Sequence, residues 1–179
     1  ANFVDFASLT SAGTIKKVSS GSITAGGLSV VGNDDSDAAQ PRPLTIANFG
    51  DELGLGVCGA SDTSGGTLCD TSTTADSDRA PTGVWNGQLD ELENDGDAES
   101  ITISEDSTDM TGQFKLGSFD GSEAGNVTYG SNTVTFQRVG AGGSILFSTL
   151  AGSAISQISG NVFLLTLGGF SDSITSVTF

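Results

Sequence analysis

Two acidic segments carry the residue types that bind a hard divalent cation. Calcium takes roughly six to eight oxygen ligands, and neighbouring carboxylates together with backbone carbonyls on a glycine-containing turn can supply them. We therefore predict calcium binding at one or both segments, with a plain solvated loop as the alternative for each. The candidate ligands are Asp34, Asp35 and Asp37 in the first segment, and Glu91, Glu93, Asp95 and Asp97 in the second.

The second segment resembles the first half of an EF-hand loop. Glu91, Glu93, Asp95 and Gly96 stand at suitable spacing. The twelfth position of such a loop needs a bidentate Glu, whereas this chain has Thr102 there, and no flanking helices are evident. A calcium site here would therefore be of another type.

The two cysteines, Cys58 and Cys69, lie in a stretch rich in Gly, Ser, Thr and Asp. No His is present to complete a zinc site. We predict a disulfide between them, which would restrict the unfolded chain and contribute roughly 2–3 kcal/mol. A disulfide indicates an oxidising compartment. The alternative is two unpaired thiols.

Catalytic chemistry has few candidates in this chain. The absence of His excludes a Ser-His-Asp triad, a Cys-His pair and histidine ligands for a hydrolytic zinc. Paired carboxylates can hydrolyse glycosides. The acidic residues, however, cluster among Gly and Asn, a context typical of solvated turns. We predict that the protein is not an enzyme.

Trp85 is the only tryptophan, and it lies in a Gly- and Asn-containing loop. Together with Tyr129 it could form a platform on which a sugar ring stacks. The alternative function is therefore a calcium-dependent carbohydrate-binding β-sandwich module. More often a lone loop Trp covers a small hydrophobic cluster, and the other aromatic residues are ten Phe, which belong inside.

The charge balance narrows the choice of partners. With 22 acidic residues against 6 Lys and Arg, the net charge of −16 repels nucleic acid and anionic lipid. Divalent cations, basic surfaces and neutral glycans remain compatible. The longest apolar run, residues 162–165, is far below the ~20 residues that cross a bilayer, so no membrane insertion is expected. We expect a secreted protein whose signal peptide has been removed.

Alternation of apolar and polar residues recurs along the chain and predicts β-strands separated by Gly, Asn and Asp turns. About ten strands in residues 1–179 indicate one all-β domain, a jelly-roll-like two-sheet β-sandwich. Long acidic loops are expected at 33–43 and 59–99, the second with a short helix or irregular cap near 88–93. The expected strands are 2–6, 13–18, 22–31, 44–49, 99–104, 113–119, 126–129, 133–139, 144–150, 161–167 and 173–179.

Either terminal segment is a candidate subunit-linking strand. An exposed strand can complete the sheet of the next subunit by strand addition, and the alternative is a buried central strand. The segments are residues 2–8 and 173–179. The expected contact residues are Phe3, Val4 and Phe6 at one end, and Ile174, Val177 and Phe179 at the other.

Several strings resemble one bacterial family. Residues 54–57 (GLGV) precede a Cys/Gly loop, 89–94 (LDELEN) precede 99–103 (ESITI), and 114–120 and 174–179 look like further strands. This order is similar to that of exosortase-processed surface proteins with PEP-CTERM anchors. We expect that cleavage has removed the anchor segment. Residues 104–106 (SED) replace the usual strand-ending Phe.

The resemblance implies export from a Gram-negative bacterium and a place in extracellular matrix, sheath or floc. The leading hypothesis is a structural subunit of an extracellular filament, sheath or matrix on the cell surface. Its expected partners are copies of itself, with extracellular polysaccharide as a further candidate.

Overall fold

The computed structural model of the chain describes residues 4–34, 41–49, 52–58, 63–64, 67–68, 99–116, 124–139, 144–160 and 162–179. In these residues the regular structure is β-strand apart from one 3₁₀ helix, η1 (Phe6–Leu9). The predicted all-β class is confirmed. The strands are β1 (Thr14–Val18), β2 (Ser22–Ala25), β3 (Leu28–Asp34), β4 (Leu44–Phe49), β5 (Glu52–Val57), β6 (Thr63–Ser64), β7 (Thr67–Leu68), β8 (Glu99–Glu105), β9 (Gln113–Leu116), β10 (Ala124–Tyr129), β11 (Asn132–Arg138), β12 (Ile145–Phe147), β13 (Ala154–Ser159), β14 (Val162–Thr166) and β15 (Ser176–Thr178).

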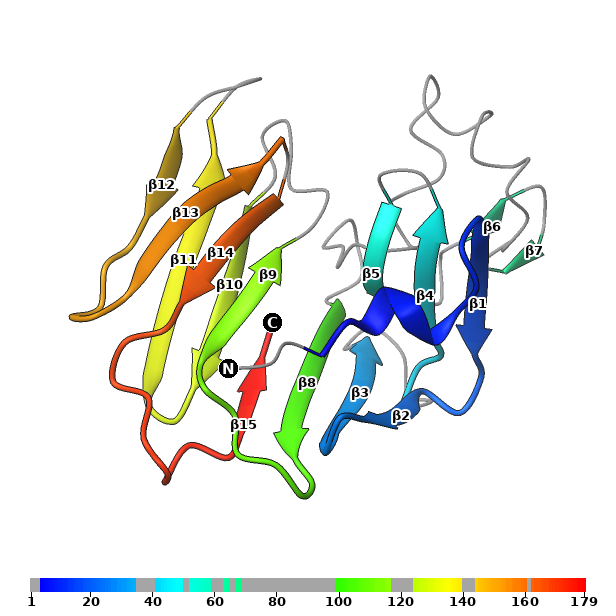
Figure 1. The fold of residues 1–179 in the computed structure, drawn as a ribbon, viewed down its shortest axis with the longest axis horizontal. Helices are drawn as coiled ribbons and strands as arrows, with labels where there is room; N and C mark the ends of the chain where they lie inside the picture. The colour runs from blue at the N-terminus through cyan, green and yellow to red at the C-terminus, as the bar shows by residue number, and fades with distance from the viewer. Residues whose placement is uncertain are drawn as a thin grey trace.

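A seven-stranded sheet, ordered β12-β11-β10-β15-β8-β3-β2, runs through the molecule. One half of it packs against the three-stranded sheet β13-β14-β9, and the other half against the three-stranded sheet β1-β4-β5. Figure 1 shows these two smaller sheets towards opposite ends of the molecule. The arrangement is that of a β-sandwich, while the finer jelly-roll description stays a prediction.

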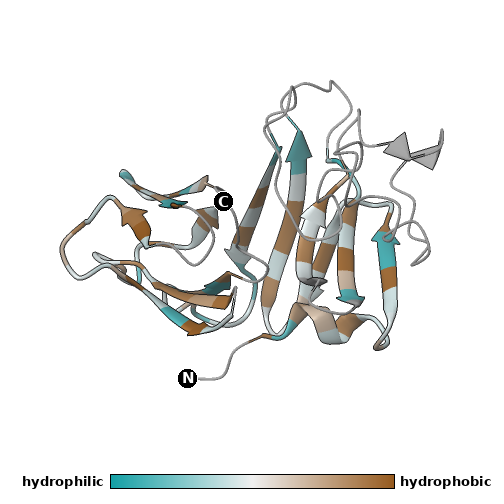
Figure 2. Ribbon diagram, turned by 90° about the horizontal axis from the view of Figure 1, so that it is seen from above, coloured by the Kyte–Doolittle hydropathy of each residue, from teal (hydrophilic) through white to brown (hydrophobic). Residues whose placement is uncertain are grey.

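Two hydrophobic clusters fill the space between the sheets. The first contains Val127 and Leu165, and the second contains Leu44 and Ile103. Both arise because every second residue of a strand points inwards, which Figure 2 shows as alternating bands of hydropathy along the strands. Phe179 contacts both clusters, so the chain's last residues connect them.

The C-terminal strand lies inside the sheet of its own chain. β15 pairs with β8 through three register positions and with β10 at Thr128↔Thr178. Val177 is fully buried, Ile174 packs on the first cluster, and the Phe179 ring meets Phe114 edge-on with centroids 4.9 Å apart. The prediction of a strand in 173–179 is confirmed, and within the monomer it occupies a central position.

The predicted N-terminal strand is wrong over residues 4–6. Val4 and Asp5 belong to no strand, η1 begins at Phe6, and Phe3 lies outside the described residues. Phe6 packs on the second cluster and the next residue, Ala7, is also buried. Consecutive side chains of a strand point to opposite faces, so two adjacent inward residues do not fit a regular strand, and here they begin a 3₁₀ helix.

Candidate assembly edge

Two strands end their sheets at one end of the molecule. β12 is the last strand of the seven-stranded sheet and β13 is the last of the sheet β13-β14-β9. Within the described residues each pairs on one side only, and Figure 1 shows both at the left-hand end. The outer side of an edge strand presents N–H and C=O groups that can pair with another strand. We call this end, β12 with β13 and the adjacent Val139, the open edge.

Large apolar side chains are exposed along the open edge. Leu146 of β12 is 59% exposed, Ile158 of β13 is 49% exposed and Val139 is 48% exposed. Leu146 points outwards because its neighbours Ile145 and Phe147 pack on the core. Ile158 lies where the register of β13 shifts between Gln157 and Ser159, and such a bulge re-aims a side chain. Apart from these three, Leu9 is the one exposed large hydrophobic residue in the described part of the chain.

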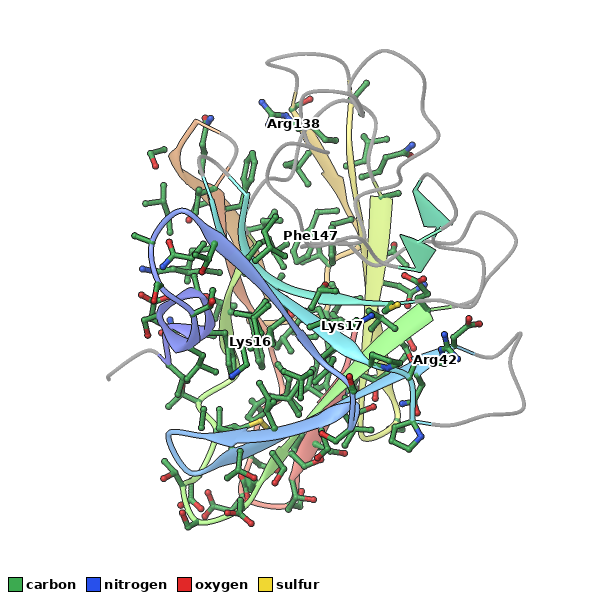
Figure 3. All side chains as sticks on the ribbon, turned by 90° about the vertical axis from the view of Figure 1, so that its right-hand side faces the viewer. Lys16, Lys17, Arg42, Arg138 and Phe147 are labelled. Atoms are coloured by element: carbon green, nitrogen blue, oxygen red, sulfur yellow. The ribbon has the colours of Figure 1, made fainter. Side chains whose placement is uncertain are left out.

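No ionisable side chain occurs in residues 139–171, the segment that contains the open edge. The preceding charge, Arg138, is 5% exposed and points inwards from β11. Its guanidinium carbon lies 5.2 Å from the centroid of the Phe163 ring, within the range of a cation–π contact. Figure 3 labels Arg138 and Phe147, the latter on β12. The open edge is therefore uncharged in a chain whose net charge is −16.

The edge strand β1 has the opposite chemistry. It ends the sheet β1-β4-β5 and carries Lys16 and Lys17, which are both exposed and are labelled in Figure 3. Lysine on an edge strand discourages pairing with another chain because its ammonium group resists burial. Only β12 and β13 thus combine exposed large apolar side chains with an absence of charge among the described edge strands.

The predicted calcium ligands are only partly placed. Asp34 is fully buried at the end of β3, and its register partner is Glu99, the first residue of β8. The two acidic segments therefore adjoin the same end of the seven-stranded sheet. The remaining candidates, Asp35, Asp37, Glu91, Glu93, Asp95 and Asp97, lie outside the described residues, and the described part contains no cluster of three or more His, Cys, Asp or Glu side chains. Calcium binding stays a prediction.

The cysteine pair is also only partly placed. Cys58 is fully buried after β5, and its carbonyl oxygen accepts a hydrogen bond of 3.0 Å from Arg42 Nε. No free cysteine occurs in the described part of the chain, and Cys69 lies outside it. The predicted Cys58–Cys69 bridge stays a prediction.

One of the two residues of the predicted aromatic platform is buried. Tyr129 is 2% exposed, and its hydroxyl donates a hydrogen bond of 2.9 Å to the carbonyl of Gly168. It is a core residue because its position in β10 faces inwards, so it cannot stack on a sugar at the surface. Trp85 lies outside the described residues.

Comparison of the chain with protein-family models, with curated proteins and with solved structures finds no match. None of the helices in the described residues is long and apolar enough to cross a membrane. The open edge itself was not among the predicted contact sites. The sequence does contain its signal, the uncharged run 139–171, but that run does not reveal which of its strands lies at an edge.

Proposed function

We propose that the protein is a structural subunit of an extracellular filament, sheath or matrix, and that copies associate by β-strand addition at the open edge. One observation carries this proposal. A chain with a net charge of −16 exposes Leu146, Ile158 and Val139 at sheet edges that hold no charge.

Electrostatics favours a second copy at this place. Copies of an acidic protein repel one another wherever their carboxylates approach within about 8 Å, the screening length at physiological ionic strength. At the open edge two copies can meet without like charges facing each other, and large apolar side chains are exposed there. Burial of its apolar side chains contributes about 25 cal/mol per Å², and ladder hydrogen bonds between the edges supply direction.

The structure also bears on which strand is added. β15 is buried between β8 and β10, so exchanging it between subunits would require breaking both ladders and exposing Val177. Adding β12 of one copy to an edge of the next breaks nothing. Edge addition therefore replaces terminal-strand donation in the proposal.

An extracellular location is part of the proposal. It is supported by the predicted Cys58–Cys69 bridge and by the resemblance to exosortase-processed surface proteins. Calcium is proposed at the sheet end where Asp34 and Glu99 adjoin, since a divalent cation would neutralise part of the acidic charge there. The alternative, a calcium-dependent carbohydrate-binding module built on Trp85, gains no support from the described residues.

Electron microscopy of the untagged protein, with and without a calcium chelator, tests the proposal. Regular filaments or sheets are expected in calcium. Their loss in chelator would show that the ion contributes to assembly, and their persistence would show that assembly does not need calcium. Dispersed monomers in both conditions would overturn the structural role.

A further inference from the structure

The outer face of the seven-stranded sheet is lined by small hydroxyl and amide side chains. Inward positions hold β-branched residues such as Val127, Val134 and Val177, and the positions between them point outwards. We call this outer surface the hydroxyl face. Its Ser, Thr and Asn residues are Ser22, Thr24, Ser29, Asn33, Ser100, Thr102, Ser104, Ser176, Thr178, Asn126, Thr128, Thr133 and Thr135.

The strand register aligns these side chains into two rows across the sheet. The first row joins threonines of β11, β10, β15 and β8. The second joins hydroxyl residues of β15, β8, β3 and β2. Because neighbouring strands lie about 4.8 Å apart, each row of four spans roughly 14 Å. The first row is Thr133, Thr128, Thr178 and Thr102, and the second is Ser176, Ser104, Ser29 and Thr24.

The hydroxyl face carries no charged side chain on any of its seven strands. The charges that these strands do hold point inwards: Asp34 and Arg138 are buried, and Glu99 and Glu105 share the inward alternation of Ile101 and Ile103. A solvated sheet face ordinarily includes Lys and Glu. This chain has 28 charged residues, 22 acidic and 6 basic, so their absence from its widest face is not a consequence of composition alone.

Two neighbouring threonines of the first row are held in place before any ligand arrives. The hydroxyls of Thr102 and Thr178 are hydrogen-bonded to each other at 2.9 Å across β8 and β15. Threonine has a stiff χ1 angle, so its hydroxyl loses little freedom on binding. Asn126, Thr128, Thr133 and Thr135 are exposed.

We propose that the hydroxyl face is a binding surface for a neutral polysaccharide. Each Ser or Thr hydroxyl donates one hydrogen bond and accepts others, which matches the donors and acceptors of sugar hydroxyls. The acidic charge of the rest of the chain repels anionic glycans and nucleic acid, whereas a neutral glycan meets no such barrier. The rows provide a polar track across four strands along which an extended glycan chain can lie.

This inference goes beyond the structural role, and it rests on the hydroxyl rows rather than on the exposed apolar side chains of the open edge. The binding experiment uses dilute protein with a Leu146→Ser background, which removes the exposed apolar side chain of β12 without placing a charge on the outer face, so that retention reports single subunits. The probes are microcrystalline cellulose, chitin and insoluble β-1,3-glucan, with alginate as the anionic comparison.

In that background a triple variant changes Thr128, Thr133 and Thr135 to Val, and a matched variant changes the same residues to Ser. Valine keeps the shape and strand propensity but removes the hydroxyls, whereas serine keeps them. We expect retention on at least one neutral glycan and none on alginate. The Val variant should bind at least about tenfold more weakly, and the Ser variant should keep most of the binding.

Circular dichroism and thermal unfolding establish that both variants fold. Failure to bind all three neutral probes, retention on alginate, or equal binding by the Val variant would each overturn the proposal. None of these results affects the electron-microscopy test of self-assembly.

Discussion

The edge strands at the two ends of the molecule carry opposite kinds of exposed side chain. At one end β1 carries the exposed Lys16 and Lys17, and at the other β12 exposes Leu146 in an uncharged segment. Both are edge strands, β1 of a three-stranded sheet and β12 of the seven-stranded sheet, so edge position alone does not explain the difference. An edge that must stay unpaired is protected by charge. The comparison shows that β12 lacks such a protecting charge. Copies of this highly acidic chain can therefore approach one another at β12 without repulsion between carboxylates.

The largest expected effect comes from giving the open edge the protection that β1 has. Leu146→Lys places a charge on the outer face of β12, and we expect the protein concentration needed for assembly to rise at least about tenfold, because association would desolvate that charge. Monomer stability should change by less than about 0.5 kcal/mol, since the Leu146 side chain is 59% exposed.

Sedimentation measures the fraction assembled, and Ser19→Lys provides the control. It adds the same charge at an exposed turn beside β1 and should leave assembly unchanged. Equal assembly by wild type and Leu146→Lys would remove β12 from the contact.

The cations at the two ends differ in burial, and alanine substitution separates their roles. Arg138→Ala removes a side chain packed inside the sandwich and its contact with Phe163, so we expect a loss of about 2–4 kcal/mol in the free energy of unfolding. Lys16→Ala should change it by less than about 0.5 kcal/mol. Urea unfolding followed by circular dichroism measures both, and similar values would contradict the inward placement of Arg138.

A converse double substitution removes the protection of β1. Lys16→Val with Lys17→Thr gives that strand two uncharged, β-branched residues in place of its exposed charges. We expect a second adhesive edge and therefore a severalfold rise in light scattering at equal protein concentration. Unchanged scattering would mean that something other than charge keeps β1 unpaired.

The smallest effect expected is that of salt. Raising ionic strength from 0.01 M to 0.1 M shortens the screening length from about 30 Å to about 10 Å, which weakens repulsion between acidic copies. Assembly of the wild type should require a few times less protein at the higher salt. If the protein concentration needed for assembly increased with salt, attraction between opposite charges would be indicated instead.

Much of the strand pattern was predictable because apolar residues alternate where one face is buried. The segments around 99–104, 126–129 and 133–139 follow this rule and correspond to β8, β10 and β11. One expected strand, 22–31, is instead the hairpin of β2 and β3. Its turn is Gly26 and Gly27, with φ of 59° and 81°, values that favour glycine and suit a two-residue hairpin turn.

Four strands escaped prediction. β6 and β7 are two-residue strands inside the expected loop 59–99, and β13 and β5 were missed for identifiable reasons. β13 has its isoleucines three apart, at Ile155 and Ile158, because the register shift adds a residue and breaks the two-residue period. In β5 the alternation is hidden by Gly54 and Gly56, which offer no side chain to read.

The candidate site was less predictable than the fold. Leu146 lies in an edge strand only because of the order of strands in the sheet. That order is set by contacts between residues far apart in the chain. The same holds for the threonine row, in which Thr102 and Thr178 become neighbours only through pairing of β8 with β15. Alternation reveals which side chains share a face, but not which strands lie beside each other.

Hydrogen–deuterium exchange, compared between dilute monomer and assembled protein, tests the central claim most directly. Amides of residues 145–147 lie in the strand at the open edge, and new ladder hydrogen bonds would slow the exchange of those that face outwards. The account predicts added protection in β12 or β13 on assembly and none in β1. Protection that appears in β1 while β12 and β13 exchange as in the monomer would contradict it.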